Sequence, residues 1–230
     1  MLLENICLNQ IFKEITYDDG RFSLLVRPVE ETDAEMIHSV VVLSLDNLKP
    51  FMDWSHRELS VEKQVERIRT SNTNSSKGIS YDFAVFDKGT NEFLMSASLH
   101  VARVPNRKSL GIGYWTSSKH CNKGLATLIT KILTVIAFEN LGCDRVEIGC
   151  NKANQKSIKV IEKCDFKFEC EARNYFSKPT QNMILQGYNP GRIGRLYSLT
   201  KEDIKSLNWY ETICKNTKII TVQSTSKLGD

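Results

Sequence analysis

Between residues 79 and 200, segments with the apolar spacing of strands and of helices follow one another in a definite order. This order constrains the fold of the chain more than any other feature of the sequence. It begins with three runs rich in aliphatic and aromatic residues, which the turn signals Lys88-Gly89 and Pro105-Asn106 separate. Runs of this composition, joined by short connections, are typical of an antiparallel meander. The predicted strands span residues 79–86, 93–104 and 109–116.

A long helix follows the meander. Apolar residues recur at helical spacing from Leu125 to Ile136, and the pattern ends at Gly142, where a C-terminal glycine is favoured. A strand, a helix and two further strands complete this half of the chain. They are predicted at residues 145–150, 155–164, 166–173 and 194–200, respectively. This order predicts a mixed α/β domain.

The N-terminal half adds a strand and two helices. Phe22 to Val29 reads as a strand, and Thr32 with Glu35 forms a capping box at the start of a helix that extends to about Leu45. A loop, a polar helix and a polar linker follow at residues 46–60, 60–69 and 72–78. We therefore expect one domain over residues 21–208, an N-terminal extension at 1–20, and a C-terminal tail at 209–230 whose order the sequence does not decide.

Composition narrows the function classes. The 230 residues include 31 basic and 27 acidic side chains, a small and dispersed excess that argues against a nucleic-acid surface but suits a small polyanionic ligand. No apolar run is long enough to span a membrane, and the N-terminus lacks a signal-peptide pattern. Seven scattered cysteines without C-x-x-C spacing, and histidines without ligand spacing, predict reduced thiols and no metal site. We expect a cytoplasmic protein.

The segment Trp115 to Ala126, WTSSKHCNKGLA, is the part of the sequence that most suggests chemistry. A helix start leaves several backbone N–H groups without partners and carries partial positive charge, so it binds phosphate where side chains leave room. Gly124 leaves that room and Asn122 tolerates unusual backbone geometry, while two lysines add charge. An ordinary strand-to-helix turn explains the same residues, and this segment alone does not decide between the two interpretations.

Several motifs, taken in order, resemble the GNAT acetyltransferases, specifically the branch related to RimJ and RimL that acetylates N-terminal amines of ribosomal proteins. The resemblance covers about residues 22–200. Cys121 to Ala126 is similar to the pyrophosphate loop of that superfamily, and Gly113-Tyr114-Trp115 is similar to the strand end before it. The other matching motifs are Leu25-Val26-Arg27-Pro28, Leu48 to Trp54, Asn154-x-x-Ser157 and Glu162 to Lys167.

The resemblance implies a GNAT fold, a central twisted sheet of about seven mostly antiparallel strands with flanking helices, and acetyl-CoA as cosubstrate. In this chemistry an amine attacks the thioester directly, so orienting the two reactants supplies much of the catalysis. The residues that the resemblance places against acetyl-CoA are Trp115, Thr116, Ser117, Cys121, Asn122, Lys123, Gly124, Leu125, Ala126, Thr127, Asn154 and Ser157.

Ser157 and His100 are the predicted catalytic residues. Asn154 and Ser157 share one face at a helix start, and the resemblance implies that Ser157 protonates the leaving thiolate. Asn154 also reads as the cap of that helix, a role compatible with contact to CoA. His100 is the favoured candidate for the general base because a histidine pKa lies near neutrality, and Glu147 and Tyr114 on other strands are further candidates. A structural role is the alternative for each of the three.

The chain departs from the family pattern at three positions. Gly111 stands where relatives often carry an acidic residue, which leaves the general base open. Cys121 replaces the usual Gln or Arg, and Asn122 replaces a frequent Gly. Because such a loop works mainly through backbone N–H groups, we expect it to bind phosphate nonetheless.

We predict an N-acetyltransferase that moves acetyl from acetyl-CoA to a primary amine, with a protein N-terminal amine of the ribosomal type as the favoured acceptor. Phe51, Met52 and Trp54 are candidates for the acceptor pocket. A small amine such as a polyamine, an antibiotic or a toxin is the alternative acceptor, and a non-catalytic acyl-CoA-binding module is the alternative class. We expect no nucleic-acid or membrane partner, and a monomer and a homodimer fit the sequence equally.

Overall fold

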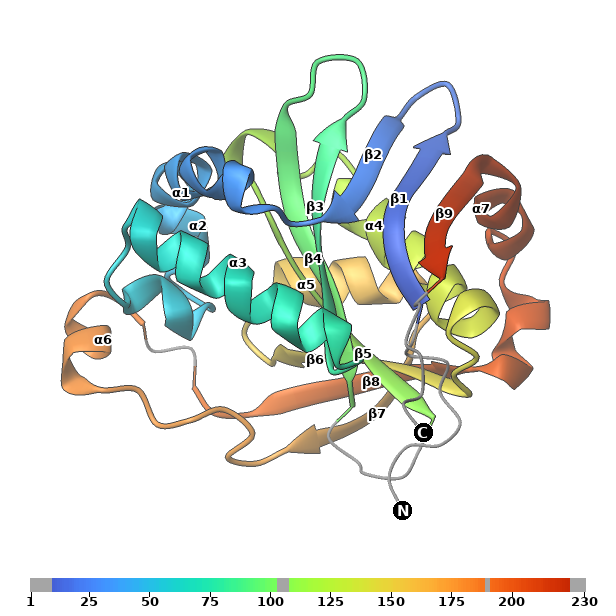
Figure 1. The fold of residues 1–230 in the computed structure, drawn as a ribbon. Coiled ribbons are helices and arrows are strands. Elements are labelled where there is room, and N and C mark those ends of the chain that lie inside the picture. Colours follow the sequence, from blue (N-terminus) through green and yellow to red (C-terminus); the bar gives the residue numbers. More distant parts are fainter. Residues whose placement is uncertain (1–9, 103–107, 189–190, 224–230) are drawn as a thin grey trace, which may run out of the picture.

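The computed structural model describes residues 10–102, 108–188 and 191–223, and these residues form one sheet with helices on both faces (Figure 1). The strands are β1 (Gln10–Asp18), β2 (Ser23–Pro28), β3 (Ser80–Asp87), β4 (Phe93–Val101), β5 (Ser109–Thr116), β6 (Arg145–Asn151), β7 (Lys167–Ala172), β8 (Gly194–Thr200) and β9 (Thr217–Gln223). Their order in the sheet is β7-β8-β6-β5-β4-β3-β2-β1-β9. The β5–β6 pair is parallel, whereas the other pairs are antiparallel.

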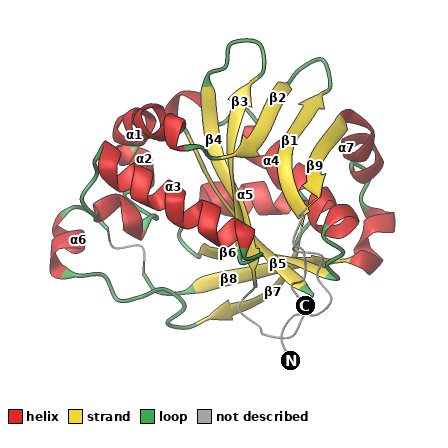
Figure 2. Ribbon diagram, in the orientation of Figure 1, coloured by secondary structure: helices red, strands yellow, loops and turns green. Residues whose placement is uncertain are grey.

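Helices form a layer on each face of the sheet (Figure 2). They are α1 (Ala34–Leu43), α2 (Leu45–Leu48), α3 (Val61–Ser76), α4 (Leu125–Val135), α5 (Gln155–Glu162), α6 (Gln181–Leu185) and α7 (Tyr210–Asn216). One buried cluster joins α4, α5 and α7 to one face of the sheet, and a second joins α1 and α3 to the other. The predicted mixed α/β architecture and the antiparallel β3–β4–β5 meander are confirmed. The turn predicted at Pro105-Asn106 lies outside the described residues.

The sheet is larger than predicted, with nine strands in place of about seven. The two additional strands come from the predicted extension and tail: β1 pairs with β2 on one side and with β9 on the other. β9 contains Ile219 to Val222, a run too short to assign from sequence, and its partner lies at the opposite end of the chain. A pairing between segments this far apart leaves no local signal, whereas the β1–β2 hairpin is local and has its turn signal at Asp18-Asp19-Gly20.

The helix α3 is also longer than predicted and occupies most of the expected linker at 72–78. Its second half is rich in Ser, Thr and Asn, which are poor formers of helix interiors. The hydroxyls of Thr70 and Thr73 bond to the carbonyls of Glu66 and Arg69, each at 2.9 Å. Ser71 is buried on the same helix, so tertiary packing outweighs the weak local propensity.

The feature of the fold that matters most for function is the divergence of β5 from β6. The two strands pair only where Ser109 to Gly111 faces Arg145 to Glu147. Beyond these residues β5 continues to Thr116 and β6 to Asn151 without pairing to each other. A gap therefore opens in the middle of the sheet, and both strands present backbone groups to it.

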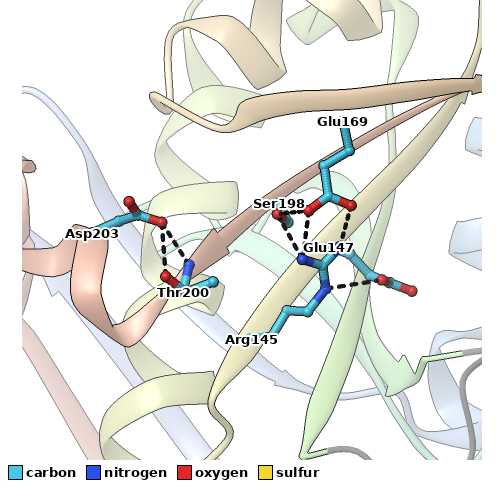
Figure 3. A network of polar contacts seen from close by, with 6 residues as sticks. All are labelled: Arg145, Glu147, Glu169, Ser198, Thr200 and Asp203. Carbon is cyan, nitrogen blue, oxygen red and sulfur yellow. Dashed lines mark hydrogen bonds and ion pairs between the residues drawn. The ribbon is translucent and has the colours of Figure 1, made fainter.

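A network of polar contacts holds the strands together next to this divergence (Figure 3). Arg145 on β6 donates two hydrogen bonds to Glu169 on β7, at 2.6 and 2.5 Å, and one to Ser198 on β8 at 2.9 Å. The Arg145 guanidinium holds the pKa of Glu169 below its ordinary value. The network thus fixes β6, β7 and β8 at the end of β6 that still pairs with β5.

β1 lies within the predicted N-terminal extension, yet side chains on it are buried. We therefore predict that these side chains contribute strongly to the stability of the fold. Phe12 is 2% exposed, and its ring makes edge contacts with Tyr81 and Phe83, with centroids 5.2 and 5.8 Å apart. We expect Phe12→Ala to lower the free energy of unfolding by about 3 to 5 kcal/mol, because it removes the apolar contacts and leaves a cavity. Urea unfolding followed by circular dichroism measures this change.

The matched control is Ile220→Ala on the neighbouring strand β9, where the side chain is 52% exposed. It should change the free energy of unfolding by less than about 1 kcal/mol, since little apolar area leaves water there. Equal effects of the two substitutions would show that β1 does not belong to the cooperative core.

Candidate active site

The loop between β5 and α4 has the backbone geometry of an anion site. Asn122 and Gly124 both adopt the left-handed conformation, with φ of 62° and 88°. Gly124 is the N-cap of α4, and no side chain hydrogen bonds to the helix start there. Residues 122–124 are exposed, so the first N–H groups of α4 face an open surface.

Contacts with the surrounding elements fix the path of this loop. The N–H of Ser117 donates to the carbonyl of Leu94 at 3.0 Å, and the N–H of Ser118 donates to the buried hydroxyl of Ser44 at 3.0 Å. The thiol of Cys121 lies 3.5 Å from the carbonyl oxygen of Ser117 and closes the turn. Cys121 therefore shapes the loop, although it replaces the residue usual in the family.

Arg21 reaches the same loop from the turn between β1 and β2. Its guanidinium donates to the carbonyl of Lys123 at 3.2 Å, across 102 positions of sequence. Asp19 orders the turn by accepting from the N–H groups of Arg21 and Phe22 at 2.9 and 2.7 Å. Arg21 thus brings a cation beside the positive end of α4, an arrangement that fits a phosphate site. Sequence reasoning did not find Arg21, and no local motif marks it.

The predicted CoA-contacting residues divide into backbone and side-chain contributors. Leu125 is buried, and the Trp115 ring packs against Phe93 and Trp54, so these two side chains serve the core. Ser117 is buried as well. The members that lie on the β5 end, in the loop or in the first turn of α4 are Trp115, Thr116, Ser117, Cys121, Asn122, Lys123, Gly124, Leu125, Ala126 and Thr127. Asn154 and Ser157 come from the start of α5, on the other side of the gap.

A cavity of about 740 Å³ extends through the gap between β5 and β6. Its lining includes Ile112 to Trp115 and Ile148 to Asn151, the unpaired ends of these two strands. On the α5 side it is lined by Asn154 and Ser157, and on the α3 side by the predicted acceptor-loop residues Phe51, Met52 and Trp54. One continuous space therefore connects the two faces of the sheet.

A hydroxyl pair lies at the wall of this cavity. The hydroxyls of Tyr114 on β5 and Ser157 on α5 are 3.0 Å apart, so the pair bridges the gap. The side chain of Asn154 accepts from the N–H of Ser157 at 3.1 Å and caps α5, as the alternative reading of Asn154 required. Burial raises the pKa of Tyr114 above its ordinary value, so its phenol keeps its proton at neutral pH.

Cys150 lines the cavity beside this pair. Burial raises the pKa of its thiol to about 11, and contact with Ser157 offsets the shift only in part. A protonated thiol is a weak nucleophile, which agrees with a structural role for Cys150.

The floor of the cavity on the α3 side is a row of small and polar residues across three strands. Asp82 on β3 faces Ser98 on β4, and Ser98 faces Gly113 on β5. All three line the cavity. A Cβ at Gly113 would lie 2.9 Å from the Ser98 hydroxyl, so only glycine leaves this floor open.

His100 lies one step further along the same face of β4 and is not among the residues that line the cavity. Its ring covers Gly111: a Cβ at that glycine would lie 2.4 Å from His100 Nε2. Its Cε1 would be 4.0 Å from a Cβ at Gly113, which does line the cavity. His100 therefore occupies the space above the position where relatives often carry an acidic side chain.

Comparison with known proteins agrees with this geometry. Residues 23–167 match the family model of the acetyltransferase (GNAT) domain. The chain belongs to the GNAT acetyltransferases. As a member of this family, with N-acetyltransferases among its relatives, it is an acetyl-CoA-dependent N-acetyltransferase.

Two relatives of this GNAT enzyme come from Bacillus subtilis. The "Probable N-acetyltransferase YjcK" is 29% identical over 152 residues, which cover 66% of this chain and 84% of the relative. The "Putative ribosomal N-acetyltransferase YdaF" is 27% identical over 158 residues, which cover 66% of this chain and 81% of the relative.

Solved structures share the GNAT fold. RimJ of Mycobacterium smegmatis, in complex with CoA-disulfide, aligns with a TM-score of 0.71 at 18% identity over 90% of this chain and 95% of that one. RimL, a ribosomal alpha-N-protein acetyltransferase in complex with coenzyme A, aligns with a TM-score of 0.67 at 19% identity over 77% and 93% of the two chains. At these identities the likeness shows the fold.

Two further findings, on membrane-spanning helices and on metal-binding groups, apply to the residues that the structure describes. None of their helices is both long enough and apolar enough to cross a membrane. They also bring together no group of three or more His, Cys, Asp or Glu side chains that could hold a metal ion.

The geometry of the α4 start makes Gly124 a sensitive test of CoA binding. An alanine at φ of 88° costs about 1 to 2 kcal/mol, which the loop relieves by leaving the conformation that exposes its N–H groups. We expect Gly124→Ala to weaken the binding of CoA about tenfold, as measured by isothermal titration calorimetry.

The matched control is Gly142→Ala, which has the same backbone strain at φ of 64° but lies beyond the far end of α4. It should lower stability and leave CoA affinity unchanged. If both variants bind CoA with unchanged affinity, the loop is not the diphosphate site.

Proposed function

We propose that this enzyme transfers acetyl from acetyl-CoA to the N-terminal amine of a protein, of the ribosomal type, in the cytoplasm. The observation that carries the proposal is the cavity that passes through the gap between β5 and β6. It lets a thioester held on the α5 side meet an amine that enters from the α3 side. The relative named as a ribosomal N-acetyltransferase and the RimJ and RimL folds support this acceptor class.

In this proposal the β5–α4 loop and Arg21 hold the diphosphate end of CoA, and the unpaired edges of β5 and β6 orient the arm that carries the thioester. Placing the two reactants in one cavity supplies roughly 7 kcal/mol or more of the barrier. The amine then attacks the thioester carbon, the C–N bond forms, and the C–S bond breaks. The chain must accept one proton from the amine and deliver one to the CoA sulfur.

Ser157 delivers the proton to sulfur, and Tyr114 resupplies it through their 3.0 Å contact. We expect Ser157→Ala to lower kcat about a hundredfold while the KM for acetyl-CoA changes little, because the loss falls on the transition state. Thiol release in steady state measures both constants, and CoA affinity by calorimetry verifies the fold. An unchanged kcat would remove Ser157 as the acid.

His100 takes the proton from the amine in this proposal, directly or through water, from its place above Gly111. An N-terminal amine, with a pKa near 8, is already neutral in about a tenth of molecules at pH 7, so a base of ordinary strength suffices. We expect His100→Ala to lower kcat/KM about a hundredfold and to remove the inflection that a histidine base gives to its pH profile.

A second variant tests the same role by replacing the group. Gly111→Glu alone should displace the His100 ring, since its Cβ would lie 2.4 Å from His100 Nε2. Combined with His100→Ala, the glutamate has room and should recover part of kcat/KM, with the inflection moved to lower pH. Retention of full activity and of the pH profile in His100→Ala would place the base elsewhere.

The acceptor itself is tested by a screen of peptides with free N-termini against polyamines, aminoglycosides and amino acids, with thiol release as the readout. Acetylation of peptides at the α-amine, located by mass spectrometry, supports the proposal. Acetylation confined to small amines would contradict the acceptor class, and CoA binding without turnover of any amine would contradict catalysis.

A further inference from the structure

The helix α3 presents a polar stripe to the cavity on the acceptor side. Ser60, Lys63, Gln64 and Arg67 follow helical spacing, and all four line the cavity. Val61, Val65 and Ile68 on the same helix pack into the adjacent hydrophobic cluster. A helix that covers a sheet usually turns only apolar residues inward, so this polar face indicates a ligand rather than packing.

Three cations border the cavity on this side, and they differ in their partners. Lys63 pairs with Glu66 at 3.0 Å, and Arg57 pairs with Asp53 at 3.5 Å. Arg67 contacts the side-chain amide of Gln64 at 3.4 Å and, within the described part of the chain, has no carboxylate oxygen within 4.0 Å. Arg67 is therefore the cation of this set whose charge no acidic residue neutralises by direct contact.

Arg67 is exposed at the edge of the cavity, where its guanidinium is open to a ligand. Desolvation by neighbouring atoms lowers the pKa of Arg67, and the charge of Asp82 on β3 counteracts that shift only in part. An arginine stays protonated in such a site and has five N–H donors, more than its contact with Gln64 uses. A planar guanidinium matches a carboxylate, which it binds through two parallel hydrogen bonds.

We propose that Arg67 is a specificity residue that binds the carboxylate of an acidic side chain close to the N-terminus of the acceptor. The inference rests on the proposed function, since it names which protein N-termini the enzyme prefers. Ser157 and Tyr114 border the cavity on its α5 side, and Arg67 borders it on the α3 side. The acceptor amine therefore points toward the gap while the following residues pass α3.

Peptides with the same N-terminal residue and either Asp or Asn at position two or three test the inference. We expect the wild type to prefer the Asp peptide at one of these positions by about tenfold or more in kcat/KM, the range for a hydrogen-bonded charge pair. Arg67→Gln should abolish the preference for the Asp peptide. Arg67→Glu should reverse it toward a Lys peptide.

The matched control is Arg69→Gln on the same helix, because Arg69 pairs with Glu31 at 2.8 Å and does not line the cavity. This variant should keep the preference for Asp. Equal rates with Asp and Asn peptides at both positions, or a preference that survives Arg67→Gln, would overturn the inference alone and leave the proposed function in place. Acetylation of free aspartate with no acetylation of any peptide would overturn both.

Discussion

The active site of this enzyme depends on the parallel pairing of β5 and β6, which covers only a short part of each strand. The strands share only the stretch from Ser109 to Gly111 against Arg145 to Glu147, and then they part. Because they are parallel, the chain must cross over between them, and α4 supplies most of that crossover. The start of α4 therefore lies beyond the open end of β5. The proposed diphosphate site and the proposed thioester site thus arise from the same divergence.

Close contacts on both sides hold the divergence open. At the paired end, Arg145 ties β6 to β7 and β8, and the His100 ring lies directly on Gly111. At the open end, Tyr175 from the β7–β8 connection packs onto two glycines: a Cβ on either Gly149 or Gly194 would come within 2.5 Å of it. Side chains at these glycines would push Tyr175 out and reshape the cavity wall, so the missing Cβ atoms are part of the site.

Local signals explain what could be predicted from sequence. The periodicity of α4, the left-handed Asn122 and Gly124, and the positive φ at Gly142 are properties of consecutive residues, so the sequence reveals them. The strand β9 and its pairing with β1 could not be found in this way, because the two partners lie about two hundred positions apart. The same reason hid Arg21 and Arg67, whose roles come from elements that meet only in the folded chain.

The position of His100 shows how a departure from the family pattern becomes interpretable only in three dimensions. From sequence, Gly111 removes an acidic residue and leaves the base open. In the fold, the absence of a side chain at Gly111 is what allows the His100 ring to lie on β5 beside Gly113. The absence of an acidic side chain at Gly111 on β5 and the presence of the His100 ring from β4 in that space are therefore two parts of one structural change on paired strands.

The acidities of the groups in the cavity favour direct transfer over a covalent intermediate on the protein. With a pKa raised to about 11, only about one Cys150 thiol in ten thousand is ionised at pH 7. An acceptor α-amine with a pKa near 8 is neutral about a thousand times more often. Thiolate is the better nucleophile, but its greater intrinsic reactivity must overcome that ratio and a second transfer step. Because the proposed function lets the amine reach the thioester through this cavity, attack by the amine itself is the shorter path.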